Sequence, residues 1–186
     1  MRTRKMIGNV LASALLAALP VVVAGAFAGG PVPAAEMAHK AAPSTGHAGD
    51  FEKIKKLAGE WTRDGQGDQV AVTYKLTAQG TAVVETLFPG AAYEMMTVYH
   101  MDGKNLMLTH YCSGGNQPRM KAAPAGADGK VTFKFAGATG MKSPNDEHMH
   151  DMSMTFIDED HVKASWTSYS GGRKSDVKEF NLTRKK

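Results

Sequence analysis

The feature that most constrains the fold of this chain is an alternation of apolar and polar residues that begins at Val70 and recurs almost to Arg184. A period of two is typical of a β-strand with one face in the core and the other in water. No stretch after Leu57 shows a helical period of useful length. The apolar members are Val70, Val72, Tyr74, Leu76, Val131, Phe133, Phe135, Met152, Met154, Phe156, Val162, Ala164, Trp166, Phe180 and Leu182.

Turn-forming residues divide these segments, among them Gln79-Gly80, Pro89-Gly90 and Gly171-Gly172. The spacing predicts roughly eight to ten strands, as in a sandwich or barrel. We expect an up-and-down antiparallel β-barrel, because a meander that closes on itself leaves no strand edge exposed. Residues 51–61 predict a short amphipathic helix that runs into Gly59-Glu60-Trp61, where the first strand opens.

The first residues of the chain have a different character. Arg2, Arg4 and Lys5 lead into an apolar run that ends in Ala26-Phe27-Ala28, which is typical of an export signal with a small-residue cleavage site. We therefore expect a signal peptide at 1–28, a flexible Pro/Ala/Gly/His spacer at 29–49 and one domain at 50–186. The mature protein is then periplasmic or secreted, with no membrane span, although an uncleaved anchor is an alternative.

Charge and cysteine content exclude some classes of function. The formal net charge is +4, and without the three cations at positions 2, 4 and 5 it falls to +1. The remaining Lys and Arg are interspersed with acidic residues, so no nucleic-acid partner is expected. Cys112 is the only cysteine, so no internal disulfide can form.

A short helix, Gly59-x-Trp61, the strand series and Arg184 near the end together resemble the lipocalin-like barrels of the calycin superfamily. The resemblance implies that Trp61 lies at the closed end of a barrel, with the Arg184 guanidinium over its ring. The alternative is a buried tryptophan in another β-sandwich. Residues 84–90, 108–112 and 115–119 are also similar to stretches of small uncharacterised bacterial exported domains, and that resemblance implies no activity.

No cofactor is expected from these resemblances. Nitrobindin-like haem barrels share the Gly-x-Trp opening, but a resemblance to them requires a histidine near the C-terminus. The last strand expected here, Val177 to Arg184, contains none.

The interior of the barrel can be inferred from one hairpin. If Asp102-Gly103 forms its two-residue turn, Met101 faces Lys104 and Met95 faces His110. His110 is then a polar group in a largely apolar lumen, either satisfied by a neighbouring hydroxyl or carbonyl or orienting a ligand. The side chains assigned to the interior are Tyr93, Met95, Tyr99, Leu106, Leu108, His110 and Cys112.

Residues 113–119 follow this strand and are expected to line the mouth of the barrel. Asn116, Gln117 and Arg119 offer directional hydrogen bonds there. Arg119 suits a carboxylate of a ligand, or alternatively pairs with Glu85 or Glu94.

Two further hypotheses concern metal and catalysis. In a regular strand His148, His150, Met152 and Met154 share one side, a donor set that suits copper or zinc, although the two methionines equally continue the apolar face. An enzyme that uses Glu85, His110 and Arg119, or Cys112 with His110, is the other hypothesis, but no hydrolase, phosphate-loop or zinc-protease motif supports it.

The sequence thus predicts an exported barrel that binds a small hydrophobic or amphipathic molecule in its lumen and catalyses nothing. The main alternative is a filled barrel with a structural or protein-binding role, because large inward side chains can occupy the lumen.

Overall fold

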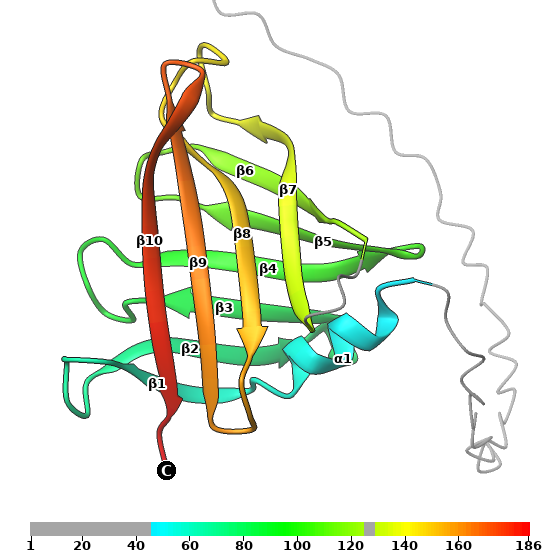
Figure 1. Ribbon diagram of the computed structural model, residues 1–186, viewed down its shortest axis with the longest axis vertical. Helices are drawn as coiled ribbons and strands as arrows, with labels where there is room; N and C mark the ends of the chain where they lie inside the picture. Colours follow the sequence, from blue (N-terminus) through cyan, green and yellow to red (C-terminus); the bar gives the residue numbers. More distant parts are fainter. Residues whose placement is uncertain (1–45, 125–128) are drawn as a thin grey trace, which may run out of the picture. The chain divides into compact units, whose positions relative to one another are not determined.

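A computed structural model describes residues 46–124 and 129–186 (Figure 1). They form a closed antiparallel barrel of ten strands preceded by one short α-helix, which confirms the predicted fold class. The predicted signal peptide at 1–28 and the predicted spacer up to residue 45 lie outside the described residues. The elements are α1 (Ala48–Lys55), β1 (Gly59–Arg63), β2 (Val70–Thr77), the 3-10 turn η1 (Ala78–Gly80), β3 (Ala82–Leu87), β4 (Met95–Asp102), β5 (Asn105–Tyr111), β6 (Gln117–Ala122), β7 (Lys130–Thr139), β8 (His148–Phe156), β9 (His161–Ser170) and β10 (Arg173–Arg184).

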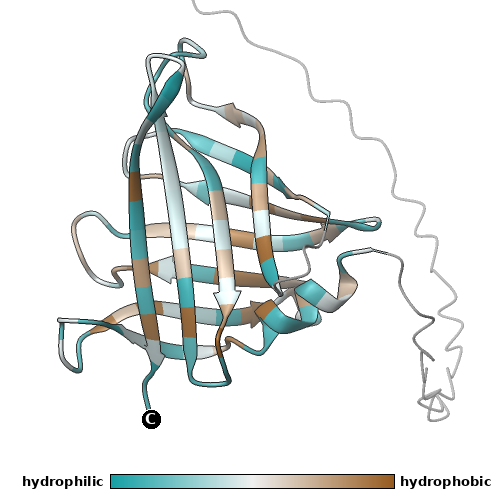
Figure 2. Cartoon of the chain, viewed as in Figure 1, coloured by the Kyte–Doolittle hydropathy of each residue, from teal (hydrophilic) through white to brown (hydrophobic). Residues whose placement is uncertain are grey.

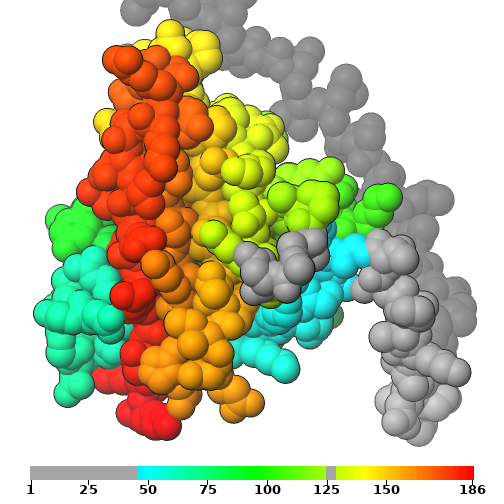
Figure 3. Space-filling view, in the orientation of Figure 1, coloured from blue at the N-terminus to red at the C-terminus, as the bar shows by residue number. Residues whose placement is uncertain are grey.

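Each strand pairs with its neighbours in sequence, and β1 pairs with β10 to close the ring. The period of two puts alternate side chains inside, which Figure 2 shows as alternating brown and teal bands along the strands. Figure 3 shows the orange and red strands β8, β9 and β10 packed as a continuous wall. Fully buried inward side chains include Val72, Tyr74, Tyr99, Phe133, Met152, Met154, Trp166 and Leu182.

Helix α1 covers the end of the barrel where β4 turns into β5 (Figure 1). It begins at Ala48, so residues 48 and 49 are helical although the sequence placed them in the spacer. Phe51 and Ile54, one helical turn apart, are buried together with Leu57 in the core. Just before the helix, the backbone N–H of His47 donates to the carbonyl of Lys104 at 3.3 Å.

Trp61 and Arg184 pack against each other at the end of the barrel that α1 covers. The two residues are paired across β1 and β10, and the guanidinium lies 4.4 Å from the centroid of the fully buried indole. The indole N–H donates to the carbonyl of Leu57 at 2.8 Å. Gly59 is required beside them, because its φ is +133° and a Cβ there would lie 3.2 Å from the guanidinium.

The guanidinium of Arg184 also ties three segments together. It donates to the carbonyls of Lys56 at 2.8 Å, Ala58 at 2.9 Å and Glu159 at 3.1 Å. These contacts connect the end of α1 and the β8–β9 turn to the last strand.

Replacing Arg184 with leucine is expected to lower the free energy of unfolding by about 2 kcal/mol. Leucine still covers the indole but leaves three carbonyls without their donor, and partial exposure of the site lets water replace some of the loss. Urea denaturation followed by tryptophan fluorescence measures the change. Lys185→Leu, at an exposed neighbouring position, is the matched control and should change stability by less than about 0.5 kcal/mol. Equal stability of the two variants would mean that the contacts of Arg184 do not stabilise the fold.

The β4–β5 hairpin has a different register from the one predicted. Asp102 pairs with Asn105, so Gly103 and Lys104 are the central turn residues, and Gly103 supplies the positive φ of +57°. His110 therefore faces Thr97 and not Met95. The error is two residues along the strands, which leaves the inward face of each strand unchanged.

Strands β7 and β8 pair over only part of their length. Their register runs from Lys130 opposite Thr155 to Lys134 opposite Asp151, whereas β7 continues to Thr139 and β8 begins at His148. We call the unpaired part, residues 135–139 and 148–150, the β7–β8 seam. Loop 140–147 connects its two sides, and the side-chain amide of Asn116 donates to the carbonyl of Glu147 at 2.7 Å.

Candidate ligand-binding site

Most of the barrel interior is filled by side chains. Tyr99, Leu106, Leu108, Phe133 and Met154 are fully buried and pack in one core cluster. A cavity of about 210 Å³ remains at the end away from α1, and we call it the luminal pocket. It is lined by Arg63, Leu87, Phe88, Met95, His110, Met149, Trp166, Lys178 and Phe180.

Strand ends supply the walls of this pocket. Leu87 ends β3, Met95 begins β4, and His110 lies one residue before the end of β5. Phe88, just after β3, has a φ of +55°, an uncommon conformation for a non-glycine residue. Its N–H donates to the carbonyl of Ala71 at 2.7 Å, which holds the ring at the mouth of the pocket.

His110 and Trp166 form the polar part of the lining. Their ring centroids are 4.7 Å apart with a 43° tilt, and only 2% of the His110 surface is exposed. Burial lowers the pKa of His110 from 6.5 to about 4, so the imidazole is neutral at pH 7. The Nε2 of His110 and the Nε1 of Trp166 are buried without a hydrogen-bond partner among the described residues.

A buried network connects His110 to Glu85. Tyr74 and Tyr99 donate to the Glu85 carboxylate at 2.7 and 2.9 Å, and Thr97 also bonds to it. Burial raises the pKa of Glu85, and these three hydrogen bonds offset part of that rise. When Glu85 is ionised, the one hydroxyl proton of Thr97 is donated to it. The Nδ1–H of His110, 3.0 Å from that hydroxyl oxygen, is then the donor, which leaves a lone pair on Nε2.

The mouth of the pocket carries positive charge. The Arg63 guanidinium lies 5.5 Å from the centroid of the Phe180 ring and makes no ion pair within residues 46–124 and 129–186. Lys178 is exposed and its ammonium is 2.7 Å from the carboxylate of Asp176. Arg63 is thus the cation at this mouth that an anionic group of a ligand can reach without breaking an ion pair.

Some of the residues predicted to line the lumen lie inside the barrel and others do not. Tyr99 and His110 are buried inside, and Met95 lines the luminal pocket. The prediction is wrong for Tyr93, which lies in the loop before β4, is 58% exposed and contacts Phe88 edge to face. Cys112 follows β5, is half-buried, and its sulfur accepts the N–H of Gly114 at 3.5 Å.

The three polar residues predicted at the mouth have other positions. Asn116 is buried and bonded to loop 140–147, and Gln117 accepts a hydrogen bond from the hydroxyl of Thr139 at 2.8 Å. Arg119 is exposed on β6 and lies over Gly137 of β7. None of the three lines the luminal pocket.

The histidines of β8 do not share a face with Met152 and Met154. The pairing with β9 shifts between Met149 and Asp151, so His150 is an extra residue in a bulge. His148 is paired with Tyr169 on the outer side, whereas the two methionines are buried inside. Among the residues that the structure describes, no three His, Cys, Asp or Glu side chains come together to hold a metal ion.

The residues of the catalytic hypothesis do not form one site, because Arg119 lies apart from Glu85 and His110. Glu85 is buried and bonded to two tyrosines, His110 is bonded to Thr97, and Arg119 is on the outside. Cys112 and His110 make no hydrogen bond with each other in the described part of the chain.

Comparison with known proteins adds no assignment to this geometry. No protein-family model matches the chain, and no curated protein matches it. The closed ten-stranded antiparallel barrel is compatible with a lipocalin-like barrel. In the described ranges, none of the helical segments has the length and apolar character needed to span a bilayer.

Proposed function

We propose that this protein binds a small amphipathic molecule in the luminal pocket and performs no chemistry on it. The observation that supports the proposal most is a cavity of about 210 Å³ whose wall includes His110 and Trp166, each with a buried ring nitrogen that lacks a partner. Buried polar groups are usually satisfied, and a ligand hydroxyl can donate to Nε2 of His110 or accept from the N–H of Trp166. An anionic end of the same ligand would contact Arg63 at the mouth.

The cavity volume limits the size of the ligand. An engineered protein cavity of about 150 Å³ holds benzene, so this pocket suits roughly one substituted ring or a short branched chain. Micromolar affinity for a ligand of about ten non-hydrogen atoms requires about 0.8 kcal/mol per atom, which lies below the ceiling of about 1.5 kcal/mol for very small ligands. Long lipids do not fit, because core side chains fill the rest of the lumen.

We further propose that the protein works outside the cytoplasm, periplasmic or secreted. Support comes from the charged start and apolar run of residues 1–28. The filled part of the lumen favours a second candidate function, a structural or protein-binding role with no small ligand.

The luminal proposal is tested with three probes that share a methyl-substituted benzene ring: 4-methylbenzoate, 4-methylbenzyl alcohol and toluene. Met149→Trp fills the pocket from its wall and is expected to abolish binding of all three in calorimetric titrations. Met96→Trp adds the same volume on the outer face and is the matched control. Arg63→Gln should weaken the benzoate about tenfold and leave toluene unchanged.

Two results would count against the luminal proposal. One is equal binding by Met149→Trp and Met96→Trp, which would place the probes elsewhere. The other is no binding to the wild type together with no small molecule in native mass spectra of protein purified from its own host, which would leave the structural role.

A further inference from the structure

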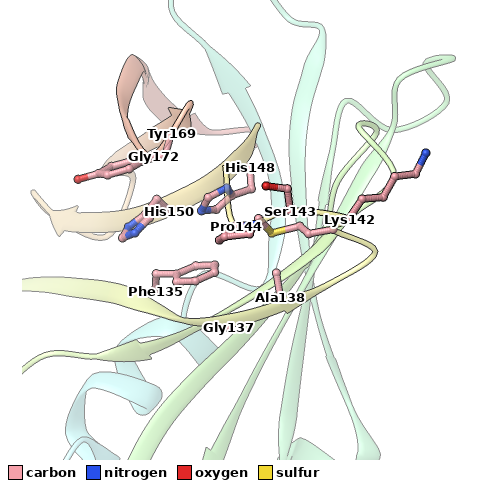
Figure 4. Close-up of a pocket in the computed structure, with 11 residues that line it drawn as sticks. Phe135, Gly137, Ala138, Lys142, Ser143, Pro144, His148, His150, Tyr169 and Gly172 are labelled. Carbon is pink, nitrogen blue, oxygen red and sulfur yellow. The ribbon is translucent and has the colours of Figure 1, made fainter. Parts of the chain in front are cut away.

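We propose a second site that goes beyond the luminal function: a Cu(I) site formed by His148 and His150 of the β7–β8 seam and Met141 of loop 140–147. These three residues line one cavity of about 420 Å³ beside loop 140–147. Figure 4 shows the two imidazoles next to each other on β8, with Phe135 and Tyr169 on either side of His150. The two histidines share the outer face because they are two residues apart, and the bulge at His150 turns that face away from Met152 and Met154.

The separation of the two rings suits one shared ion. Their centroids are 5.4 Å apart. Two imidazoles that bind the same ion through nitrogen at about 2.0–2.1 Å place their centroids roughly 5–5.5 Å apart. The spacing of the two rings is therefore compatible with both imidazoles binding one ion.

Hydrogen bonds leave the correct nitrogen of each ring for a metal. The Nδ1–H of His148 donates to the carbonyl of Asp146 at 2.7 Å, and Nδ1 of His150 lies 3.4 Å from a carboxylate oxygen of Asp151. Metal-bound histidines commonly use their other nitrogen in this way. The Nε2 of His148, a residue only 5% exposed, is buried without a partner among the described residues.

Stacking excludes an aromatic ligand between these rings. His150 is stacked on Tyr169 at 3.9 Å and on Phe135 at 4.8 Å, so both faces of the imidazole are covered. Its edge remains, and the edge is where a metal binds.

The donor set favours monovalent copper over a divalent ion. Imidazole and the thioether of Met141 are neutral, and thioether sulfur selects Cu(I) among the biological metals. Among the described residues, no carboxylate lines this cavity, whereas the positively charged Lys142 does line it. A divalent ion would bring a larger net charge into a partly buried site without a carboxylate to neutralise it, and burying such a charge is unfavourable.

The test uses the full chain under anaerobic conditions and Cu(I) in competition with a chromophoric Cu(I) chelator. We expect one Cu(I) per chain, at least about tenfold weaker binding in Met141→Leu and about 100-fold weaker binding in His150→Phe. His150→Phe keeps a ring between Tyr169 and Phe135, so the stack is preserved. X-ray absorption should report two nitrogen ligands and one sulfur ligand.

Controls separate this site from other copper ligands in the chain. His161→Gln removes an exposed histidine that bonds to Asp158, and Met96→Leu removes an exposed thioether; neither should change the affinity for Cu(I). Unfolding curves of the apo-proteins establish that each variant is folded. Wild-type affinity no tighter than micromolar, or unchanged affinity in both Met141→Leu and His150→Phe, overturns the proposal. A Zn(II) affinity that exceeds the Cu(I) affinity does so as well. Luminal binding of 4-methylbenzoate is independent of all these outcomes.

Discussion

Glu85→Ala is expected to lower the free energy of unfolding by about 3–5 kcal/mol, the largest effect among the substitutions considered. The carboxylate is fully buried and accepts the hydroxyl protons of Tyr74 and Tyr99. Alanine leaves both hydroxyls without an acceptor in the core and leaves a cavity where the carboxylate was. Chemical denaturation at pH 7 measures the loss.

Glu85→Gln is the conservative comparison. The amide oxygen still accepts one tyrosine hydroxyl, and the tyrosine oxygens accept from the amide nitrogen, so the loss should be well below that of alanine. Glu179→Ala, at an exposed position of β10, controls for removal of a carboxylate and should change stability by less than about 0.5 kcal/mol. A loss of similar size in Glu179→Ala and Glu85→Ala would contradict the role of the buried network.

The same residue predicts a dependence of stability on pH. Burial raises the pKa of Glu85 above its ordinary 4.5, so between 4.5 and the raised value the folded protein holds a proton that the unfolded chain releases. Stability from this group is therefore present at low pH and is lost as pH rises through that window. Glu85→Gln removes this slope.

Acid is expected to lower the free energy of unfolding of the wild type by roughly 3 kcal/mol through His110, and His110→Phe should not show this loss. The pKa of His110 falls from 6.5 to about 4 on folding because the ring is buried. Below pH 6.5 the unfolded chain gains a proton at this residue and the folded protein does not, so stability is complete above 6.5 and declines as pH falls toward 4. The difference between 6.5 and about 4 corresponds to roughly 3 kcal/mol.

The measurement is a series of denaturation curves from pH 7.5 to 4 for wild type and His110→Phe. The stability of the variant relative to wild type should increase steadily toward pH 4. His100→Phe, on the outer face of β4, is the control and should run parallel to wild type. Parallel curves for His110→Phe would mean that His110 titrates normally. Above pH 4.5, Glu85 makes the free energy of unfolding fall as pH rises, whereas His110 makes it rise. The two effects partly cancel in the wild type, and each single variant removes one of them.

Much of the fold follows from local patterns. The period of two in residues 70–184 predicts the strands, and turn residues predict their breaks, because each strand buries one face. Strand parity also places Arg184 on the inward side near Trp61, which is where the structure has it. The hairpin register was wrong because Asp102-Gly103 and Gly103-Lys104 are both acceptable turn pairs, and only the complete sheet chooses between them.

The binding site was less predictable for physical reasons. Its walls come from seven strands, so Met149 and Phe88 meet His110 only when the barrel closes. Arg63 was missed because no pattern distinguishes it from other surface cations. The bulge at His150 has no glycine or proline to indicate it, and it turns two histidines outward that alternation had placed beside Met152.

The incomplete pairing of β7 with β8 has a consequence for how the protein behaves in a crowded solution. At the seam, residues on two strands lack a neighbouring strand on one side and so offer backbone groups to any extended peptide. Pro144 and Lys142 in loop 140–147, with the Asn116 bond to Glu147, lie beside this gap. Proline cannot donate to a strand ladder and lysine is costly to bury, so the loop protects the molecule from edge-to-edge polymerisation.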